Sequence, residues 1–244
     1  MKNRTAESVK TDLRKVLVIF FPRFYNRHME HFTVLFEDSE ILLIHKKYGV
    51  CVQGGAGVSH SLDEDLSRQC GYKIHLVHRL DKDTEGILVV AKNAQAAAKW
   101  TRLIGEKSVK KEYCAWCAGL PQINGRECKS GKLVSTLEQH GRTLKAELFY
   151  EVSEERTVQL EEKEVKVYLL NIVLGTGRLH QIRIQLAKAG APLLADDQHG
   201  NFKLNKLLRK AGIKKLQLCA KRLTLPLGGK ERTFEIELPP HFYR

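Results

Sequence analysis

The chain has 244 residues, of which 43% are hydrophobic, so it can bury a core as one large domain or two small ones, which excludes intrinsic disorder as the default state. Its 41 Lys and Arg residues outnumber 28 Asp and Glu, and the net charge of +13 favours a polyanionic partner, most simply nucleic acid. The longest apolar run, Val16 to Phe21, is too short to cross a membrane, so no membrane association is expected.

The cysteine pattern argues against a disulfide framework. Six cysteines are scattered along the chain and no secretory leader pattern is present, so we expect a cytoplasmic protein. Cys114 and Cys117 have the spacing of a metal or redox pair, but in an extended segment positions three apart point to opposite faces. His75 and His78 likewise lack a partner pair at ligand spacing. No Gly-rich phosphate-binding loop is found either, and we expect neither a metal nor another cofactor.

The first elements follow from local patterns. Residues 1–30 carry many Lys and Arg residues and form either an RNA-contacting arm or a loosely packed N-terminal extension. Residues 32–36 and 41–45 predict a hairpin across an acidic turn. Residues 31–244 are expected to form one domain.

Helix and strand signals then alternate. A Ser-x-x-Glu capping box at residues 61–64 predicts a short helix that Gly71 ends. Four consecutive branched aliphatic residues at 87–90 predict a buried strand. Asn93 then offers an N-cap for a helix over residues 94–104.

The middle of the chain predicts strands. Residues 110–120 form an extended segment that places Tyr113 and Lys111 on one face. Residues 121–141 predict a hairpin or a surface excursion. Residues 144–152 and 165–174 predict two long strands separated by an acidic region.

The last third contains two helical patterns and a closing hairpin. Residues 179–189 place Leu179 and three further apolar residues on one stripe. Arg183 lies near that stripe and would need a carboxylate partner if buried. Residues 203–215 predict a basic helix, and residues 216–238 a hairpin.

The charged loop at residues 78–86 is the stretch with most chemistry. The strand and helix that follow can fix a carboxylate on this loop, and Arg79 and Lys82 favour its ionised form. Asp81 is therefore a candidate nucleophile or base. Taken alone, the pattern fits a surface turn with a local ion pair as well.

Three ordered blocks resemble a known family. Residues 78–86, His-Arg-Leu-Asp followed by Thr84 and Gly86, resemble the central motif of the RluA-type pseudouridine synthases, which isomerise uridine in ribosomal and transfer RNA. Residues 109–113 are similar to the Lys-x-Tyr segment of that family, and residues 177–184 to its Gly-Arg-Thr-His-Gln-Ile-Arg segment.

The resemblance implies a fold and an activity. It implies an α+β catalytic domain with a curved, mostly antiparallel sheet, flanking helices and a central basic cleft. It implies a cofactor-independent isomerase that converts a specific uridine in structured rRNA or tRNA. Asp81 would be the catalytic carboxylate, as nucleophile or as base, and Arg183 its partner. Tyr113 would contact the uracil, and Arg79 would fill the space that the flipped uridine leaves.

Binding of the RNA backbone is expected from basic side chains outside the motifs. The candidates are Lys110, Lys206, Arg209 and Lys210, and the protein is expected to act as a monomer. Two other classes stay open. One is a non-catalytic RNA-binding or assembly factor that kept the fold. The other is a zinc-dependent base deaminase, which the missing combination of His-x-Glu with Pro-Cys-x-x-Cys argues against.

Several positions depart from the family pattern. The family's Lys-Pro-x-Gly segment is Lys-Lys-Tyr-Gly here, at residues 46–49. Five further residues stand where Ser, Thr, Gly, Tyr and His are usual, namely Glu85, Leu179, Ala195, His199 and Cys219. The four implied site residues are intact, so we expect a divergent but active enzyme.

Overall fold

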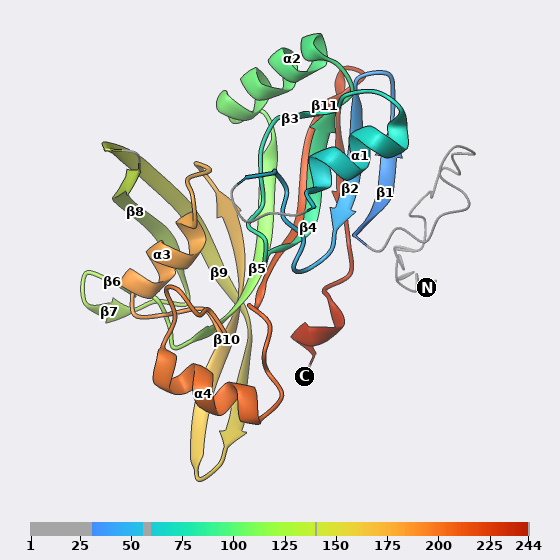
Figure 1. The fold of residues 1–244 in the computed structure, drawn as a ribbon. Coiled ribbons are helices and arrows are strands. Elements are labelled where there is room, and N and C mark those ends of the chain that lie inside the picture. The colour runs from blue at the N-terminus through green and yellow to red at the C-terminus, as the bar shows by residue number, and fades with distance from the viewer. Residues whose placement is uncertain (1–30, 56–59, 140, 244) are drawn as a thin grey trace, which may run out of the picture.

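The computed structural model describes residues 31–55, 60–139 and 141–243 (Figure 1). The basic extension over residues 1–30 lies outside the described residues. Most of the described chain forms one sheet with helices on both faces, as expected for the α+β class.

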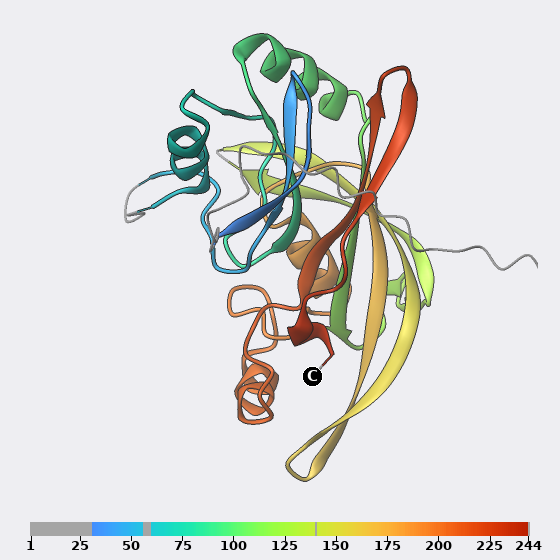
Figure 2. The same cartoon turned by 90° about the vertical axis from the view of Figure 1, so that its right-hand side faces the viewer.

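The main sheet contains ten described strands. They are β1 (Phe32–Glu37), β2 (Ile41–Lys46), β3 (His75–Leu76), β4 (Glu85–Ala91), β5 (Lys110–Ala118), β8 (Ser130–Gln139), β9 (Arg142–Leu160), β10 (Lys163–Leu174), β11 (Leu218–Leu227) and β12 (Lys230–Glu235). The order is β1-β2-β4-β11-β5-β10-β9-β8, with β3 beside β4 and β12 beside β11. Among the described strands every pairing is antiparallel except that of β4 with β11, which confirms the mostly antiparallel prediction. Figure 2 shows β9 and β10 curving along their length.

Helices cover both faces of the sheet. They are α1 (Leu62–Cys70), α2 (Ala94–Gly105), α3 (Gln181–Lys188) and α4 (Phe202–Lys210), with a short hairpin of β6 (Gln122–Ile123) and β7 (Arg126–Glu127) and a final 3-10 turn (Pro240–Phe242). Leucines of α1 and α3 join one buried cluster, whereas Trp100 of α2 and Leu208 of α4 join the other.

Strand β4 lies between the two cores. All seven of its residues are buried. Leu88 and Val90 belong to one cluster, and Ile87 and Val89 to the other. A strand covered on both faces is apolar throughout rather than alternating, which explains the run of branched residues. The loop that precedes β4 therefore ends on the most buried part of the sheet.

Local signals near the motif are confirmed. The β1–β2 hairpin has the predicted bounds within one residue. The Asn93 side chain accepts a hydrogen bond from the Ala96 N–H over 2.8 Å and caps α2. Gly71 ends α1 with φ +76°. The capping box is wrong in detail, because the Ser61 hydroxyl donates to the Asp63 carboxylate instead of capping the helix backbone.

One prediction for the middle of the chain is wrong, and another is incomplete. The acidic region is part of β9 and β10, which pair out to Leu160 and Lys163, with one register shift between Leu169 and Leu170, and form the long hairpin at the bottom of Figure 1. Residues 121–141 contain the expected small hairpin but also β8, which pairs with β9 over ten residues. These strands expose one face, so their charged residues alternate with apolar ones and resemble a polar loop in composition.

The predicted basic helix is shorter than expected. Helix α4 ends at Lys210, and Gly212 follows with φ +88°. A left-handed glycine is a common helix terminator, which the prediction to residue 215 overlooked.

Candidate active site

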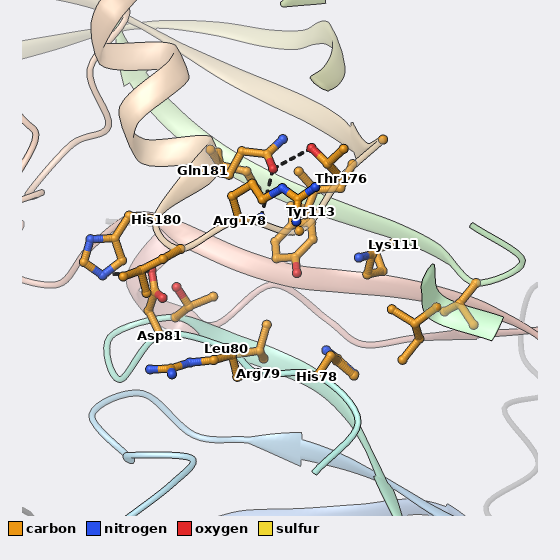
Figure 3. Close-up of a pocket in the computed structure, with 18 of the residues that line it drawn as sticks. His78, Arg79, Leu80, Asp81, Lys111, Tyr113, Thr176, Arg178, His180 and Gln181 are labelled. Carbon is orange, nitrogen blue, oxygen red and sulfur yellow. Dashed lines mark hydrogen bonds and ion pairs between the residues drawn. The ribbon is translucent and has the colours of Figure 1, made fainter. Parts of the chain in front are cut away.

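A cavity of about 620 Å³ opens where the motif loop faces β5 and the segment between β10 and α3 (Figure 3). Four implied site residues line it, namely Arg79, Asp81, Tyr113 and Arg183. They come from three separate parts of the chain, so the fold brings together what the resemblance had grouped.

His78 fixes the start of the motif loop. Its Nε2 accepts a hydrogen bond from the Val89 N–H over 3.0 Å. An imidazole nitrogen that accepts must be unprotonated, and burial lowers the pKa of His78 to about 3. A neutral, half-buried histidine therefore ties the loop to β4.

Lys46 fixes the far side of the same loop. Its fully buried ammonium donates to the carbonyl oxygens of Lys47, Val50 and Lys82 over 3.1, 3.0 and 2.9 Å. Burial lowers the pKa of Lys46 to about 8. This lysine joins the loop after β2 to the residue that follows Asp81, in the segment where the family's proline is missing.

Gly86 allows the loop to enter the sheet beside β11. A Cβ at this position would lie 2.4 Å from the Ala220 carbonyl oxygen, and φ is +142°. Only glycine fits both the close approach and this backbone conformation. The Gly of the motif is thus explained by packing.

Asp81 faces two basic groups. The Oδ2 atom of Asp81 lies 3.3 Å from Arg183 Nη1 and 3.8 Å from His180 Nε2. The Asp81 side chain is 18% exposed, so the carboxylate is accessible from the cavity. The pairing of Asp81 with Arg183 agrees with what the resemblance implied.

The main partner of Arg183 is Asp196, which sequence reasoning missed. Arg183 Nε and Nη2 donate to the two carboxylate oxygens of Asp196 over 2.8 and 2.7 Å. Asp196 is 1% exposed, and its Oδ1 also accepts the backbone N–H groups of Gln198 and His199. Burial raises the pKa of Asp196, but these hydrogen bonds outweigh it and hold the pKa below its ordinary value. The only sequence signal was a pair of aspartates shortly after α3.

Tyr113 lies on the cavity face of β5. Val109 and Lys111 line the cavity with it, as the strand alternation predicted. Tyr113 is 8% exposed, and burial together with the charge of Asp81 raises the pKa of its hydroxyl, which stays protonated. On the same strand Cys114 and Cys117 enter opposite cores, which confirms that they do not form a metal pair.

The segment between β10 and α3 is held by side-chain amides. Gln181 Oε1 accepts from the Thr176 hydroxyl and from the Arg178 N–H over 2.7 and 3.0 Å. The Gln139 amide donates to the Leu179 carbonyl and accepts from its N–H, over 2.9 and 3.3 Å. Because these bonds replace helical ones, α3 begins at Gln181, and Leu179 is 42% exposed rather than on the buried stripe.

The departure at Glu85 has a local compensation. This carboxylate is 7% exposed and lies 2.9 Å from His45 Nε2 and 3.8 Å from Lys47 Nζ. Cys219 is its neighbour in register on β11, and the thiol is fully buried. The Glu85 side chain is therefore paired with His45 of β2 and with Lys47, which follows that strand.

The predicted RNA-backbone cations do not line the cavity. Lys110 pairs with Glu112 over 3.0 Å, Lys210 with Glu161 over 2.6 Å, and Arg209 with Asp197. The cations that do line it, apart from Arg183, are Arg79, Lys107, Lys111 and Arg178. The cleft is basic, as the resemblance implied, but through a different set of residues.

Across residues 31–55, 60–139 and 141–243, no cluster of three or more His, Cys, Asp or Glu side chains has the arrangement to hold a metal ion. In the same residues no helix is long and apolar enough to span a membrane.

The profile of the RNA pseudouridylate synthase family matches residues 40–188, which include the motif loop, β5 and α3. The chain belongs to this family. The resemblance to RluA-type synthases is thereby confirmed, and every residue that lines the cavity except Leu218 lies within the matched region.

Two curated relatives are both named ribosomal large subunit pseudouridine synthase C. The one from Salmonella typhimurium is 33% identical over 210 residues, which cover 84% of this chain and 66% of that protein. The one from Haemophilus ducreyi is 35% identical over 189 residues, covering 77% and 59%. The chain thus spans about two thirds of the length of the relatives it matches.

Solved structures of this family confirm the fold. Human RNA pseudouridylate synthase domain containing 4 aligns with a TM-score of 0.65 and 23% identity, over 86% of this chain and 90% of that one. Human RNA pseudouridylate synthase domain containing 1 aligns with a TM-score of 0.64 and 20% identity, over 85% and 84%.

Proposed function

We propose that the protein is an RNA pseudouridine synthase that isomerises a specific uridine, or a few, in structured rRNA or tRNA. The observation that carries this proposal is the Asp81 carboxylate, held against Arg183 in an open cavity of a family member. The names of the relatives favour large-subunit ribosomal RNA as the first substrate to test.

The chemistry needs no outside reactant. The N1–C1′ bond of the uridine breaks, a C5–C1′ bond forms, the C5 proton leaves and N1 is protonated, so atoms and electrons balance. Asp81 acts either as a nucleophile, at the sugar or the base, or as the base of a glycal route. Both routes need an ionised carboxylate, and the Arg183 guanidinium, 3.3 Å away, supplies a counter-charge for it. We therefore propose turnover without metal, nucleotide or other cofactor.

Tyr113 and Arg79 are proposed to hold the substrate. The Tyr113 ring points into the cavity and offers a face or edge to a uracil (Figure 3). Arg79 is exposed at the cavity rim, where it can fill the stack that a flipped uridine vacates. Arg79→Ala should accordingly cost more on a duplex-embedded uridine than on an unstructured oligonucleotide.

Backbone contacts are proposed for Lys110 and for Lys206, Arg209 and Lys210 of α4. Three of these cations are engaged with surface carboxylates, in ion pairs that contribute little and exchange readily for phosphates. The monomeric state expected from the sequence remains part of this proposal.

A non-catalytic RNA-binding or assembly factor is the second candidate, and the five departures from the family pattern favour it. Incubation with unmodified large-subunit rRNA transcript, followed by mass-spectrometric pseudouridine mapping, separates the two. New pseudouridine supports the enzyme. Tight binding of rRNA and tRNA without any pseudouridine would support the binding factor.

A further inference from the structure

Two histidine rings form a chain that leads away from Asp81. His180 Nε2 lies 3.8 Å from Asp81 Oδ2, and His180 Nδ1 lies 2.9 Å from His199 Nε2. The ring centroids are 5.1 Å apart and the planes meet at 72°. Figure 3 shows the His180 ring beside Asp81, on the side away from Tyr113 and Lys111.

Both rings are held in place by the backbone. His180 precedes α3 in a left-handed conformation, with φ 51°, which is strained for a residue with a Cβ. The Gln139 amide clamps both backbone groups of the preceding Leu179. The His199 N–H donates to Asp196 over 3.0 Å. Such fixed placement suits a group that must meet a reacting atom.

The bond between the rings restricts their protons. One proton lies between His180 Nδ1 and His199 Nε2, so one ring donates and the other accepts. When Nδ1 of His180 donates, its Nε2 presents a lone pair toward the side of Asp81. The charged groups that face His180 are Asp81, Arg79, Arg183 and Asp196, and burial is the largest influence that lowers its pKa. Burial also lowers the pKa of His199, so both rings are neutral at neutral pH.

The proposed reaction needs a base at this place. After the C5–C1′ bond forms, C5 still carries its hydrogen, and C5 is then joined to the sugar carbon at which the glycosidic bond broke, beside Asp81. Arg79 and Arg183 cannot accept a proton, and the Tyr113 hydroxyl is protonated with a raised pKa. The described neutral base nearest Asp81 is His180.

We propose that His180 removes the C5 proton and that His199 passes a proton on to solvent, an inference that rests on the proposed function. The C5–H bond breaks and its electron pair restores the C5–C6 double bond, while the pi pair of the N1–C6 double bond moves to N1, which takes up a proton from solvent. The proton moves to His180 Nε2, the Nδ1 proton moves to His199 Nε2, and His199 releases its Nδ1 proton. His199 replaces the tyrosine usual in the family, so the second step belongs to this chain.

The test follows the C5 hydrogen itself. Unmodified large-subunit rRNA transcript containing 5-tritiated uridine is mixed with excess enzyme, and tritium release is timed over one turnover. His180→Gly suits the left-handed backbone and leaves room for free imidazole. We expect release to slow by about 10²-fold or more, with imidazole restoring part of the rate and RNA affinity unchanged. His199→Phe should slow release by less, on the order of 10-fold, and His60→Gln, at an exposed position, should not slow it.

An isotope effect provides the second measurement. With 5-deuterated uridine, His180→Gly should show a larger isotope effect than the wild type, because C5–H cleavage becomes rate-limiting. Release at the wild-type rate by His180→Gly, with an unchanged isotope effect, would overturn the relay while leaving the proposed function intact. A wild-type protein that releases no tritium from this RNA or from tritiated tRNA transcripts, although it binds them, would instead overturn the proposed function and the relay with it.

Discussion

Arg183 donates to both carboxylate oxygens of Asp196, over 2.8 and 2.7 Å. These two hydrogen bonds orient the guanidinium so that its third nitrogen, Nη1, donates to Asp81 over 3.3 Å. The buried carboxylate orients the arginine, and the arginine in turn faces the more exposed carboxylate. Asp196 therefore positions the counter-charge of the proposed catalytic group without lining the cavity.

Removal of the Asp196 charge should destabilise the protein. Asp196→Asn removes the nearer counter-charge of Arg183 in a nearly dry place. The free energy of unfolding, measured by chemical denaturation, should fall by on the order of 3 kcal/mol. Asp197→Asn is the matched control, since that side chain is 60% exposed and pairs with an exposed Arg209. We expect a change within about 0.5 kcal/mol for the control, and equal losses for both variants would contradict this account.

The same carboxylate should contribute to acid sensitivity. The folded pKa of Asp196 lies below its ordinary value of 3.8, so its stabilisation is complete above that pH and is lost as the pH falls through the folded pKa. At pH values below 3.8 the denaturant midpoint of the wild type should therefore decrease. The difference in midpoint between the wild type and Asp196→Asn should shrink over the same pH range. A constant difference at every pH would count against the pair.

A double-mutant cycle distinguishes the two carboxylates that Arg183 faces. Arg183→Ala strands Asp196, which is 1% exposed, and also Asp81, which is 18% exposed. Adding Asp196→Asn should recover more stability than adding Asp81→Asn, because the more deeply buried charge costs more when unpaired. The resemblance had named Asp81 alone as the partner of Arg183. A larger recovery from Asp81→Asn would reverse the order of the two pairs.

Ala195 offers a stabilising substitution. It stands where the family usually has Gly, and its φ of 57° is unfavourable for a residue with a Cβ. Ala195→Gly should raise the free energy of unfolding by on the order of 0.5 kcal/mol, after the entropy of the unfolded chain is counted. Ala191→Gly, at a fully buried position without positive φ, should lower it instead. Destabilisation by both changes would show that no strain is present at Ala195.

RNA affinity should report which cations contact phosphates. The combined neutralisation of Lys110, Lys206, Arg209 and Lys210 should flatten the plot of log affinity against log salt by about 0.7 to 0.9 per lost contact. Lys111→Gln with Arg178→Gln, two cavity cations, is the comparison set. If only the comparison set changes the slope, the RNA backbone follows the cavity and not α4.

Local sequence signals predicted much of the fold around the motif. Residues 87–90 gave the buried strand, Asn93 the start of α2, and the alternation on β5 the shared face of Lys111 and Tyr113. These features depend on neighbours within a few residues. The same reasoning failed for β8 and the outer half of β9, because strands that are exposed on one face resemble a polar loop.

Prediction of the site from the sequence was limited in the same way, to what neighbouring residues indicate. Asp81 and Arg183 are 102 residues apart in the chain, and only the resemblance joined them. Asp196 and His199 were missed as partners, since nothing local to either indicates a contact with α3 or its N-cap. A buried arginine does require a carboxylate, but the requirement does not say which one.

The central claim is that Asp81 is the catalytic carboxylate, and Asp81→Asn tests it most directly. Asparagine keeps the shape of the side chain but is neither a nucleophile nor a base. Pseudouridine formed in unmodified large-subunit rRNA transcript should be measured by mass spectrometry, beside wild type and with RNA affinity measured in parallel. We predict no pseudouridine and an affinity equal to or slightly above that of the wild type. Turnover in a pure Asp81→Asn preparation would contradict the account.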